Sequence, residues 1–300
     1  MKPIVSVIVP TYNRKVLLGE LLESLYRQTI SKPDYEVIVV SDGSKDGTAE
    51  FVRKMQKTHE TLVFIEQENQ GPAAARNRGA REAKGKYLAY TDDDCEVAAD
   101  WLENIIRTFE TKTIVGIQGR TTTYRDQKTP LTHQIDNPNG HPALPTCNAA
   151  FRKESFDRIN GFDCSFPFAH NEDADLAWRM KKIGDVSFEP SVHVVHPPRK
   201  DTFKKLSRRM RMLQSEFLLY YKDPESYRKY RNSSPWKTIY WEVFIKHQFR
   251  NLKSMVRYIF KPQYFFSGVA LVFVWWINLV LLYPTYKEAE ATYKLQFSRR

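Results

Sequence analysis

Apolar segments that alternate with helical patterns over the first 123 residues constrain the fold of this chain most strongly. Residues 4–9 form an apolar run that a proline ends at once, and leucines between Leu17 and Leu25 then recur at helical spacing. This alternation predicts a mostly parallel sheet flanked by helices, with right-handed crossovers, and hence an α/β fold. Further strands are predicted at residues 36–40, 62–66 and 87–91, and further helices at residues 49–55 and 71–83.

Polar loops follow three of the predicted strands. Residues 10–14 follow the first strand, Asp42 follows the second, and the triplet Asp92, Asp93 and Asp94 follows the fourth. Because parallel strands present their carboxyl ends at one edge of a sheet, these loops are expected to share a ligand site. Crowded carboxylates repel one another, and Mg²⁺ or Mn²⁺ bound to their oxygens would relieve that repulsion. Taken alone, the triplet is equally consistent with a solvated acidic turn at the start of a helix.

Residues 111–198 are less regular than the first part of the chain. Strands are expected at residues 113–118 and 186–189, and a helix is expected at residues 173–183, whose apolar residues fall on one face. Residues 125–145 contain four prolines, a glycine and two histidines, and this composition indicates a long loop.

The cysteine content indicates a reducing compartment. Cys95, Cys147 and Cys164 are odd in number and include no C-x-x-C pair, which argues against a disulfide framework and against a zinc site. Lys2 is the one charged residue before the first apolar run, and that run is too short to cross lipid. We therefore expect no signal peptide.

The positive charge is concentrated in the C-terminal third. Between Lys200 and Lys261 there are 16 basic and 5 acidic residues, a difference equal to the net charge of +11 of the whole chain. A neutral N-terminal body therefore carries a basic extension. Its expected partners are anionic, either phospholipid head groups or nucleic acid, and a solvated helical surface is the simpler alternative.

Residues 265–283 form an apolar run within this extension. As a helix the run would be about 28 Å long, close to the hydrocarbon thickness of a bilayer. Basic residues are denser upstream than downstream, which would place the N-terminal body in the cytoplasm if the run spans. Trp275 and Trp276 lie mid-run, which is atypical of an aromatic belt. Spanning, partial insertion and interfacial binding therefore stay open, and a hydrophobic oligomerisation surface is the rival interpretation.

Five short sequence elements occur in one order along the chain. They are VSVIVPTYNR (5–14), VVSDGSKDGT (39–48), NQGPAAARN (69–77), TDDD (91–94) and NEDADL (171–176). Each element alone is a weak signal, but together they resemble the inverting family 2 glycosyltransferases of the GT-A fold, over roughly residues 3–198. The resemblance implies a catalytic domain over residues 1–198, with a donor half up to about residue 123 and an acceptor half from 124. Residues 199–300 form a mainly helical extension outside it.

The resemblance implies a nucleotide-diphosphate sugar donor, most often a UDP sugar, and a divalent cation. The D-x-D element of the family maps to Asp92 and Asp94, which would meet the metal and the donor. Asp93 would lie on the donor side or point to a different neighbour. A cation also suits the chemistry, because a leaving nucleoside diphosphate gains negative charge as the glycosidic bond breaks. His196 is the candidate histidine ligand of Mn²⁺ or Mg²⁺, with a structural role as the alternative.

The donor-binding residues follow from position in the same elements. Asp42 maps to the residue that recognises the base in the family, and it is also suited to an Asx-turn that caps the next helix. Ser41 stands where many members carry a second acidic residue, so a base other than uracil stays open. Arg76 would face the diphosphate or lie on the helix surface. The nucleoside pocket would be lined by Pro10, Thr11, Tyr12 and Arg14, with Tyr12 stacking on the base or packing as an ordinary turn aromatic.

Inversion at the anomeric carbon needs a base that takes the proton of the acceptor hydroxyl. In the family this base is the Asp of a Glu-Asp element, which maps to Asp173, and Glu172 would orient the acceptor or the base. Asn148 is expected to touch a sugar hydroxyl. Trp178 would shape the acceptor pocket or pack in the core.

The combined interpretation is a metal-dependent inverting glycosyltransferase at the cytoplasmic face of a membrane. Its acceptor would be a saccharide or a lipid-linked precursor of cell-surface polysaccharide or glycolipid. A sugar nucleotidyltransferase is the alternative enzyme, but it would need a glycine-rich basic loop after the first strand, which residues 10–14 do not provide. A nucleic-acid-binding module would explain the basic extension but not the acidic loops, because carboxylates repel phosphates. We therefore expect no nucleic-acid partner.

Overall fold

The computed structural model describes residues 2–231 and 233–298, and the chain divides into two compact units. The first, called the sheet unit, contains the chain up to Tyr124, residues 134–165 and residues 172–197. The second, called the helical unit, contains residues 125–133, residues 166–171 and the chain from Pro198 onward. Two short internal segments thus belong with the C-terminal helices and not with the sheet.

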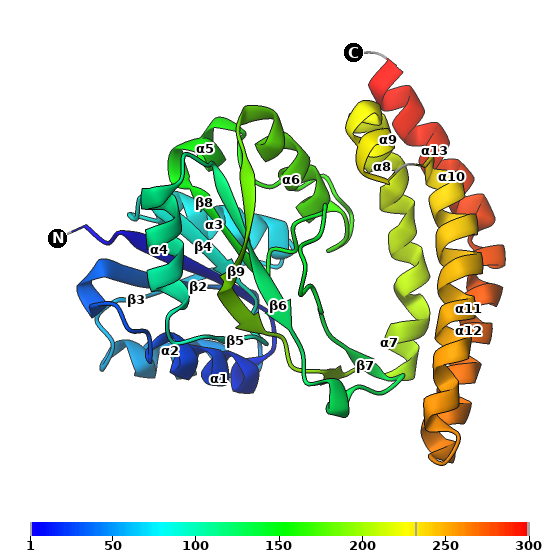
Figure 1. Cartoon of the computed structure of the whole chain (residues 1–300), viewed down its shortest axis with the longest axis horizontal. Helices are drawn as coiled ribbons and strands as arrows, with labels where there is room; N and C mark the ends of the chain where they lie inside the picture. Colours follow the sequence, from blue (N-terminus) through cyan, green and yellow to red (C-terminus); the bar gives the residue numbers. More distant parts are fainter. Residues whose placement is uncertain (1, 232, 299–300) are drawn as a thin grey trace. The chain divides into compact units, whose positions relative to one another are not determined.

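An eight-stranded sheet forms the centre of the sheet unit, in the order β3-β2-β1-β4-β8-β6-β9-β5 (Figure 1). The first four strands of this order run parallel. Strand β8 lies antiparallel between β4 and β6, β9 is parallel to β6, and the short β5 is antiparallel to β9. The bounds are β1 Val5–Thr11, β2 Tyr35–Asp42, β3 Leu62–Gln67, β4 Tyr87–Thr91, β5 Glu96–Val97, β6 Gly116–Thr122, β8 Asn148–Arg152 and β9 Val186–Val195.

Helices cover both faces of this sheet. Strands β1 and β2 are buried on both faces, which is why they are mostly apolar. The buried Ser6 of β1 donates to Glu36 of β2 at 2.6 Å. Val7 and its alternating neighbours belong to the same buried cluster as Leu22 of α1 and Ile105 of α4. Ile8 points to the opposite face and lies against Gly79 of α3. The helices are α1 Lys15–Leu25, η1 Lys32–Asp34, α2 Thr48–Gln56, α3 Pro72–Glu82, α4 Trp101–Thr111, α5 Lys153–Arg158 and α6 Glu172–Ile183.

The predicted strands and helices of the first 91 residues are confirmed with close to the expected bounds. The sequence patterns missed β8 and α4, so the sheet is mostly parallel but has an antiparallel strand near its centre. Strand β8 has the short sequence NAAFR, whose two alanines are poor strand formers. Residues 125–145, expected to be one long loop, contain the short elements η2 and β7 and divide between the two units.

The helical unit is built from short helical segments that lead into two long helices. Its apolar core includes Phe217, Ile239, Leu279 and Tyr286. Among the described residues, α12 is long and apolar enough to span a membrane, by length and composition alone. The elements are η2 Arg125–Gln127, β7 Thr132–His133, β10 Arg199–Lys200, α7 Phe203–Ser207, η3 Arg208–Gln214, α8 Ser215–Lys222, α9 Pro224–Arg231, α10 Pro235–Lys237, the π-helical segment η4 Thr238–His247, α11 Gln248–Ser254, η5 Met255–Tyr258, α12 Pro262–Leu281 and α13 Tyr283–Ser298.

A buried polar cluster in the helical unit fixes Asn171, whose backbone adopts a left-handed conformation with φ of 74°. The Asn171 amide donates to Ser215 Oγ at 3.1 Å and to Glu216 Oε1 at 3.0 Å, and its oxygen accepts from Arg231 Nη2 at 2.8 Å. The Tyr227 hydroxyl donates to the other Glu216 oxygen at 2.8 Å. Asparagine is one of the few residue types that adopts this backbone conformation readily. The cluster therefore holds the residue that directly precedes Glu172.

Asn148 of β8 stabilises an irregularity in the sheet. The register between β6 and β9 shifts after Gly119, so that Arg120 pairs with His193. The Asn148 amide donates to the carbonyl oxygens of Arg120 at 2.9 Å and Val192 at 3.0 Å. Its side-chain oxygen accepts from the indole N–H of Trp101 at 2.9 Å. Asn148 therefore donates hydrogen bonds to two backbone carbonyl groups at the point where the register between β6 and β9 shifts.

We expect Gly119→Ala to lower the free energy of unfolding by about 1–3 kcal/mol, the cost of overpacking a close-packed interior. A methyl group at this position would overlap the Asn148 amide and the Val192 carbonyl oxygen, which have no room to move. Chemical unfolding followed by circular dichroism measures the effect. The matched control is Gly19→Ala in α1, where the added carbon meets the end of the Phe51 ring at 3.2 Å. Since alanine is the better helix former, the control should keep or raise stability, and equal losses in both variants would contradict this account.

Candidate functional site

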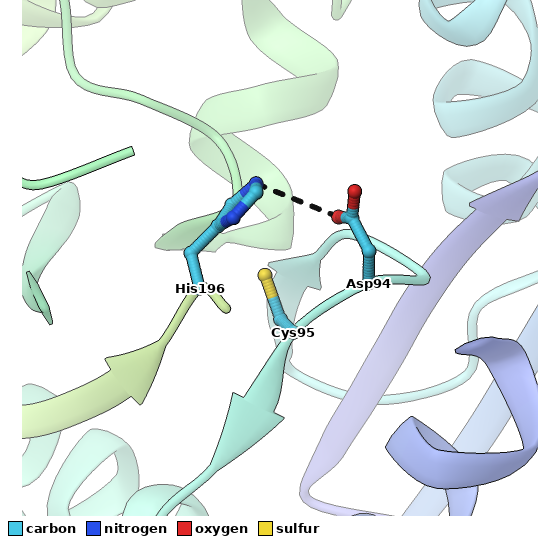
Figure 2. Close-up of side chains that lie close together, drawn as sticks. All are labelled: Asp94, Cys95 and His196. Atoms are coloured by element: carbon cyan, nitrogen blue, oxygen red, sulfur yellow. Dashed lines mark ion pairs between the residues drawn. The ribbon is translucent and has the colours of Figure 1, made fainter. Parts of the chain in front are cut away.

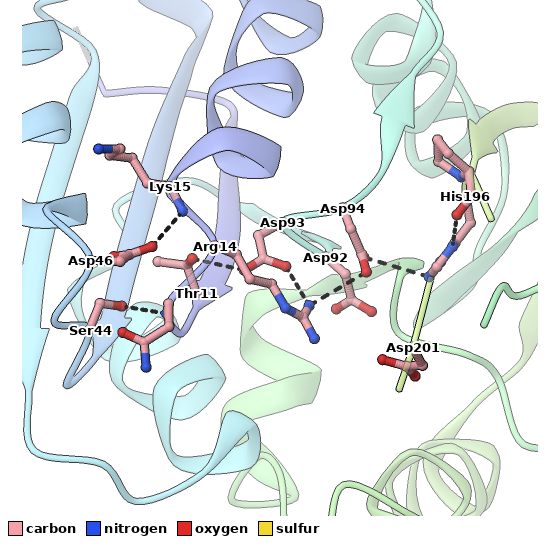
Figure 3. Close-up of polar contacts among 12 residues, drawn as sticks. Thr11, Arg14, Lys15, Ser44, Asp46, Asp92, Asp93, Asp94, His196 and Asp201 are labelled. Atoms are coloured by element: carbon pink, nitrogen blue, oxygen red, sulfur yellow. Dashed lines mark hydrogen bonds and ion pairs between the residues drawn. The ribbon is translucent and has the colours of Figure 1, made fainter. Parts of the chain in front are cut away.

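The carboxyl end of β4 is the centre of a polar cluster in the sheet unit. Asp92, Asp93 and Asp94 follow this strand directly, and Figure 3 shows their side chains with Arg14, which follows β1, and with His196, which follows β9. Because β1, β4 and β9 come from distant parts of the chain, the sheet brings these side chains together, as expected for the carboxyl edge of parallel strands.

Asp93 is buried and is held by residues from the loop after β1. Its carboxylate accepts from Thr11 Oγ1 at 2.8 Å and from Arg14 Nη1 at 2.7 Å. Burial raises the pKa of Asp93, and the Arg14 guanidinium and the two hydrogen bonds oppose that rise. Thr11 and Arg14 thus position the acidic triplet. Asp93 points to these two neighbours, which agrees with the second of the two options that the sequence left open for it.

Asp94 lies beside His196, with Asp94 Oδ1 and His196 Nε2 3.5 Å apart (Figure 2). The Cys95 thiol belongs to the same group, in which all ligand atoms lie within 4.8 Å of one another. Burial lowers the pKa of His196, which favours the neutral imidazole that binds metals. Burial also raises the pKa of the Cys95 thiol well above its usual value, so it is uncharged at neutral pH. The carboxylate and the imidazole therefore fit a divalent cation such as Mn²⁺.

Asp92 takes a different partner from Asp94. Its carboxylate accepts from Arg76 Nη2 at 2.8 Å, and it lies outside the group formed by Asp94 and His196. Arg76 Nη1 lies 3.6 Å from Glu172 Oε1, so one guanidinium connects the end of β4 with the start of α6. Burial alone would raise the pKa of Asp92, but the adjacent Arg76 outweighs it and holds that pKa below its ordinary value.

Arg76 is 6% exposed, yet it is not fully hydrogen-bonded. Among the described residues, its Nε and Nη1 have no hydrogen-bond acceptor. The nearby carboxyl groups, Asp92 above all, raise the pKa of Arg76 against the effect of burial, so the guanidinium is always charged. A buried cation with unused N–H groups is suited to an additional anionic ligand.

Glu172 and Asp173 form the first turn of α6. Asp173 accepts from Thr146 Oγ1 at 2.8 Å and from the Thr146 amide at 3.1 Å, and its side chain keeps part of its surface exposed. Burial, followed by the repulsion from Asp173, raises the pKa of Glu172 to about 8. Burial also raises the pKa of Asp173, against the opposing effect of Arg76. Asp173 is thus the accessible and oriented carboxyl group of the pair.

Asp42, at the end of β2, fixes the start of α3. It accepts from Gln67 Nε2 at 2.8 Å and from the amides of Gln70 at 2.9 Å and Gly71 at 2.8 Å. The Asx-turn expectation for Asp42 is therefore wrong, because Asp46 and not Asp42 accepts from the Thr48 amide at the start of α2.

An open pocket of about 580 Å³ adjoins this region. It is lined by Tyr12, by residues that follow β2, such as Lys45, and by residues at and just after the end of β3, such as Gln67 and Asn69. Tyr12 is 49% exposed, and an aromatic side chain at the wall of a pocket can stack on a planar ligand.

Three candidate residues lie away from this edge or inside the core. Pro10 lies within β1, ahead of the loop. Trp178 is buried in α6, which agrees with the core-packing alternative for this residue. Asn148 is fully buried and its amide is satisfied by the sheet, so we correct the expectation that it touches a sugar hydroxyl. The sequence did not indicate the contribution of Thr146, because a single threonine in an irregular segment carries no pattern.

Comparisons with known proteins agree with this arrangement. The chain matches the sequence profile described as Glycosyl transferase family 2 over residues 6–183, more than half of its length. Glycosyltransferase AglE of Haloferax volcanii is 42% identical over 107 residues, which are 35% of each chain. The putative glycosyltransferase EpsH of Bacillus subtilis is 28% identical over 196 residues, 64% of this chain and 56% of the relative. The chain thus spans between about a third and little more than half of the length of these relatives.

Two solved structures share the fold. The mannosyltransferase PcManGT from Pyrobaculum calidifontis, in complex with GDP-Man and Mn²⁺, has a TM-score of 0.63 at 23% identity, with 98% of this chain and 85% of that chain covered. Residues 1–349 of S. aureus TarS, in complex with UDP, have a TM-score of 0.54 at 21% identity, with 73% and 66% covered. At these identities the likeness shows the fold alone, and it confirms the expected GT-A architecture.

The raised pKa of Glu172 predicts a pH-dependent stability. Since this carboxyl group keeps its proton up to a pH of about 8 in the native state but only to about 4.5 when unfolded, the native state binds more protons in between. Stability therefore falls as the pH rises through this window. Glu172→Gln removes this titration, so its stability relative to wild type should increase from pH about 5 to about 8 and then level off.

Urea unfolding at a series of pH values measures this difference. Glu60→Gln, which neutralises an exposed carboxyl group in the same unit, is the matched control and should follow the wild-type curve. A Glu172→Gln curve that runs parallel to wild type across the window would show that Glu172 is not protonated in the native state.

Proposed function

Because the chain belongs to glycosyl transferase family 2, we propose that it transfers a sugar, with inversion, from a nucleotide-diphosphate sugar to a hydroxyl acceptor. One observation carries the proposal: the buried Arg76 contacts Asp92 at the end of β4 on one side and Glu172 of the Glu172–Asp173 pair on the other. The groups suited to the donor and the group suited to the acceptor thus lie around one cation. A transferase needs this proximity, because the two substrates react directly.

The donor half of the proposal rests on the pocket at Tyr12 and on Arg76. The exposed Tyr12 ring would stack on the base, and the unused N–H groups of Arg76 would bind diphosphate oxygens. Asp94 and His196, with Asp92 close by, would hold Mn²⁺ or Mg²⁺. When bound, such a cation stabilises the negative charge of the leaving diphosphate. We propose UDP as the nucleotide. UDP and GDP-Man, bound to the two structural neighbours, show that this fold accepts either base.

The acceptor half of the proposal assigns the base to Asp173. Thr146 orients this carboxylate through two hydrogen bonds, and part of its surface stays accessible. It would take the proton of the acceptor hydroxyl as that oxygen attacks opposite the leaving group, which inverts the anomeric centre. Glu172, whose pKa is raised to about 8, interacts with Arg76 and directly precedes Asp173. Its proposed role is to fix the position of Asp173 relative to the Arg76 guanidinium.

The acceptor is proposed to be a saccharide or a lipid-linked precursor at the cytoplasmic face of a membrane. The charge of the C-terminal extension and the apolar helix α12 support this location. The product would then be a precursor of cell-surface polysaccharide or glycolipid.

We expect Asp173→Asn to reduce the turnover of sugar transfer by about 10²–10⁴-fold, the usual contribution of a general base. Affinity for the nucleotide sugar should change far less than turnover, because the hydrogen bonds of Asp173 go to Thr146 and not to the proposed donor groups. Release of nucleoside diphosphate from a panel of nucleotide sugars measures turnover, and calorimetry measures binding. Asp157→Asn, an exposed carboxylate of α5, is the matched control and should retain full activity. Wild-type turnover in Asp173→Asn would remove the base role.

We expect a chelator to abolish transfer and Mn²⁺ to restore it. Asp94→Asn and His196→Ala should each weaken Mn²⁺ binding in the presence of UDP by about tenfold or more, since even the outer partners of metal ligands contribute that much. Electron paramagnetic resonance of free Mn²⁺ gives the affinity without reference to activity. Asp157→Asn again serves as control. Unchanged Mn²⁺ affinity in both variants would place the cation elsewhere.

A further inference from the structure

Two arms of the helical unit pack side by side. The first arm runs through η4, α11 and η5, and the second arm is α12 (Figure 1). The Tyr240 hydroxyl donates to the Leu279 carbonyl oxygen at 2.9 Å, and the Trp276 indole donates to the Phe244 carbonyl oxygen at 2.8 Å. Position 240 thus faces 279 and 244 faces 276, so the arms are antiparallel. We call these two arms the hairpin.

The hairpin exposes an apolar surface that continues from one arm to the other. The Trp276 ring on the second arm lies 5.7 Å from Phe249 on the first arm and 5.5 Å from Phe273 on its own arm. Phe260, near the tip, is 96% exposed. The exposed apolar side chains are Trp241, Phe249, Val256, Ile259 and Phe260 before α12, and Phe266, Phe273, Ile277, Val280 and Leu281 within it.

The first arm also carries a row of exposed basic residues. They recur at spacings of three or four residues, about one helical turn apart. Glu242 is the one acidic residue between positions 241 and 261, and α12 has no charged residue at all. The basic residues are Lys246, Arg250, Lys253 and Arg257 on the arm, and Lys261 between its end and α12.

We propose that the hairpin lies in the plane of an anionic lipid bilayer. Its exposed apolar side chains would enter the boundary between head groups and acyl chains, and the basic row would contact lipid phosphates. This inference deepens the proposed function, because it names the surface at which the enzyme works. Of the alternatives that the apolar run leaves open, which are spanning, partial insertion, interfacial binding and oligomerisation, it selects interfacial binding.

Interactions on the other side of α12 argue against a span. Trp275 donates to the Leu206 carbonyl oxygen and Asn278 donates to the Ser207 carbonyl oxygen, both at about 2.8–2.9 Å. These bonds tie α12 to α7, which contains Lys204 and Lys205 and is followed directly by Arg208. If α12 crossed the bilayer with these contacts intact, both this region and the basic first arm would enter hydrocarbon. Each buried cation would then oppose insertion.

Charge favours lipid over a second copy of the chain as the occupant of this surface. A two-fold dimer through the apolar face would bring two identical basic rows close together. Anionic head groups offer the opposite charge at the edge of an apolar layer, which is the combination that this surface matches.

The binding test uses the full-length chain and vesicles of phosphatidylcholine with or without phosphatidylglycerol. We expect co-sedimentation with the anionic vesicles and much weaker binding to the neutral ones. The double variant Phe249→Ser and Phe260→Ser should lose most of the binding. Neutralising Lys253 and Arg257 should weaken binding by roughly fivefold per residue, the factor for one basic side chain near an anionic surface.

Matched controls come from the same chain. Leu295→Ser replaces an exposed apolar residue of α13 outside the hairpin, and Lys54→Gln with Lys57→Gln removes two exposed cations of the sheet unit. Both should bind anionic vesicles like wild type. Equal losses in test and control variants would overturn the proposal. A lipid-free dimer that the Phe249→Ser and Phe260→Ser change dissolves would also overturn it, in favour of a second copy of the chain.

Depth measurements separate interfacial binding from a span. In a Cys164→Ser background, an environment-sensitive label at position 260 or 273 should report about the same shallow depth, roughly 5–10 Å below the head groups. A label at position 281 should report the same shallow depth, because Leu281 belongs to the same exposed apolar surface. A label at 273 near the bilayer centre, far deeper than labels at 260 and 281, would establish a span. Hydrolysis of nucleotide sugar without vesicles should be unchanged in the hairpin variants. Lost lipid binding with normal hydrolysis concerns the hairpin alone, whereas absent hydrolysis in the wild type would contradict the proposed function.

Discussion

The guanidinium of Arg76 is the interaction on which the candidate site depends. Five carboxyl groups, from the triplet after β4 and from the start of α6, gather around two guanidiniums, those of Arg14 and Arg76. Buried carboxylates without a cationic partner are too costly to keep charged, so without Arg76 the pair at α6 and Asp92 would repel or take up protons. Burial and the neighbouring Asp173 still raise the pKa of Glu172 to about 8, against the opposing effect of Arg76. A divalent cation beside Asp94 would supply the remaining positive charge.

The direction of β8 explains how Asp173 and the acidic triplet meet at one edge of the sheet. In an all-parallel sheet, this edge receives only the residues that follow strands. Because β8 runs antiparallel to β4, Asn148 at its start pairs with Thr91 at the end of β4. The residues just before β8, including Thr146, therefore lie at the same edge as Asp92, and Thr146 orients Asp173 there. The antiparallel strand thus contributes to the site through the segment that leads into it, while Asn148 itself is used to stabilise the shifted ladder.

The helical unit combines a rigid interior with an unusual surface. Its polar cluster around Asn171 fastens the residue that precedes the proposed catalytic pair, and its apolar core joins α8, α12 and α13. The hairpin surface, by contrast, leaves large apolar side chains next to a basic row. A soluble protein rarely keeps such a surface uncovered, because exposed apolar patches favour association. An anionic bilayer would cover the apolar side chains and would also neutralise the basic row. It would place the enzyme where lipid-linked or membrane-bound acceptors are made.

The sequence by itself determined the alternating strands and helices up to β4, the polar loops at their carboxyl ends, and the motifs that carry the family resemblance. These features are local, since strand and helix periodicity and loop composition depend on neighbours in the chain. Only the tertiary structure decided that Asp94 lies beside His196, that Arg76 joins Asp92 to Glu172, and that Asn148 is sealed in the core. Each of these contacts depends on strand order and direction, and on the burial that follows from them. No local pattern encodes the antiparallel insertion of β8 or the register shift between β6 and β9, because both arise from pairing between segments far apart in the chain.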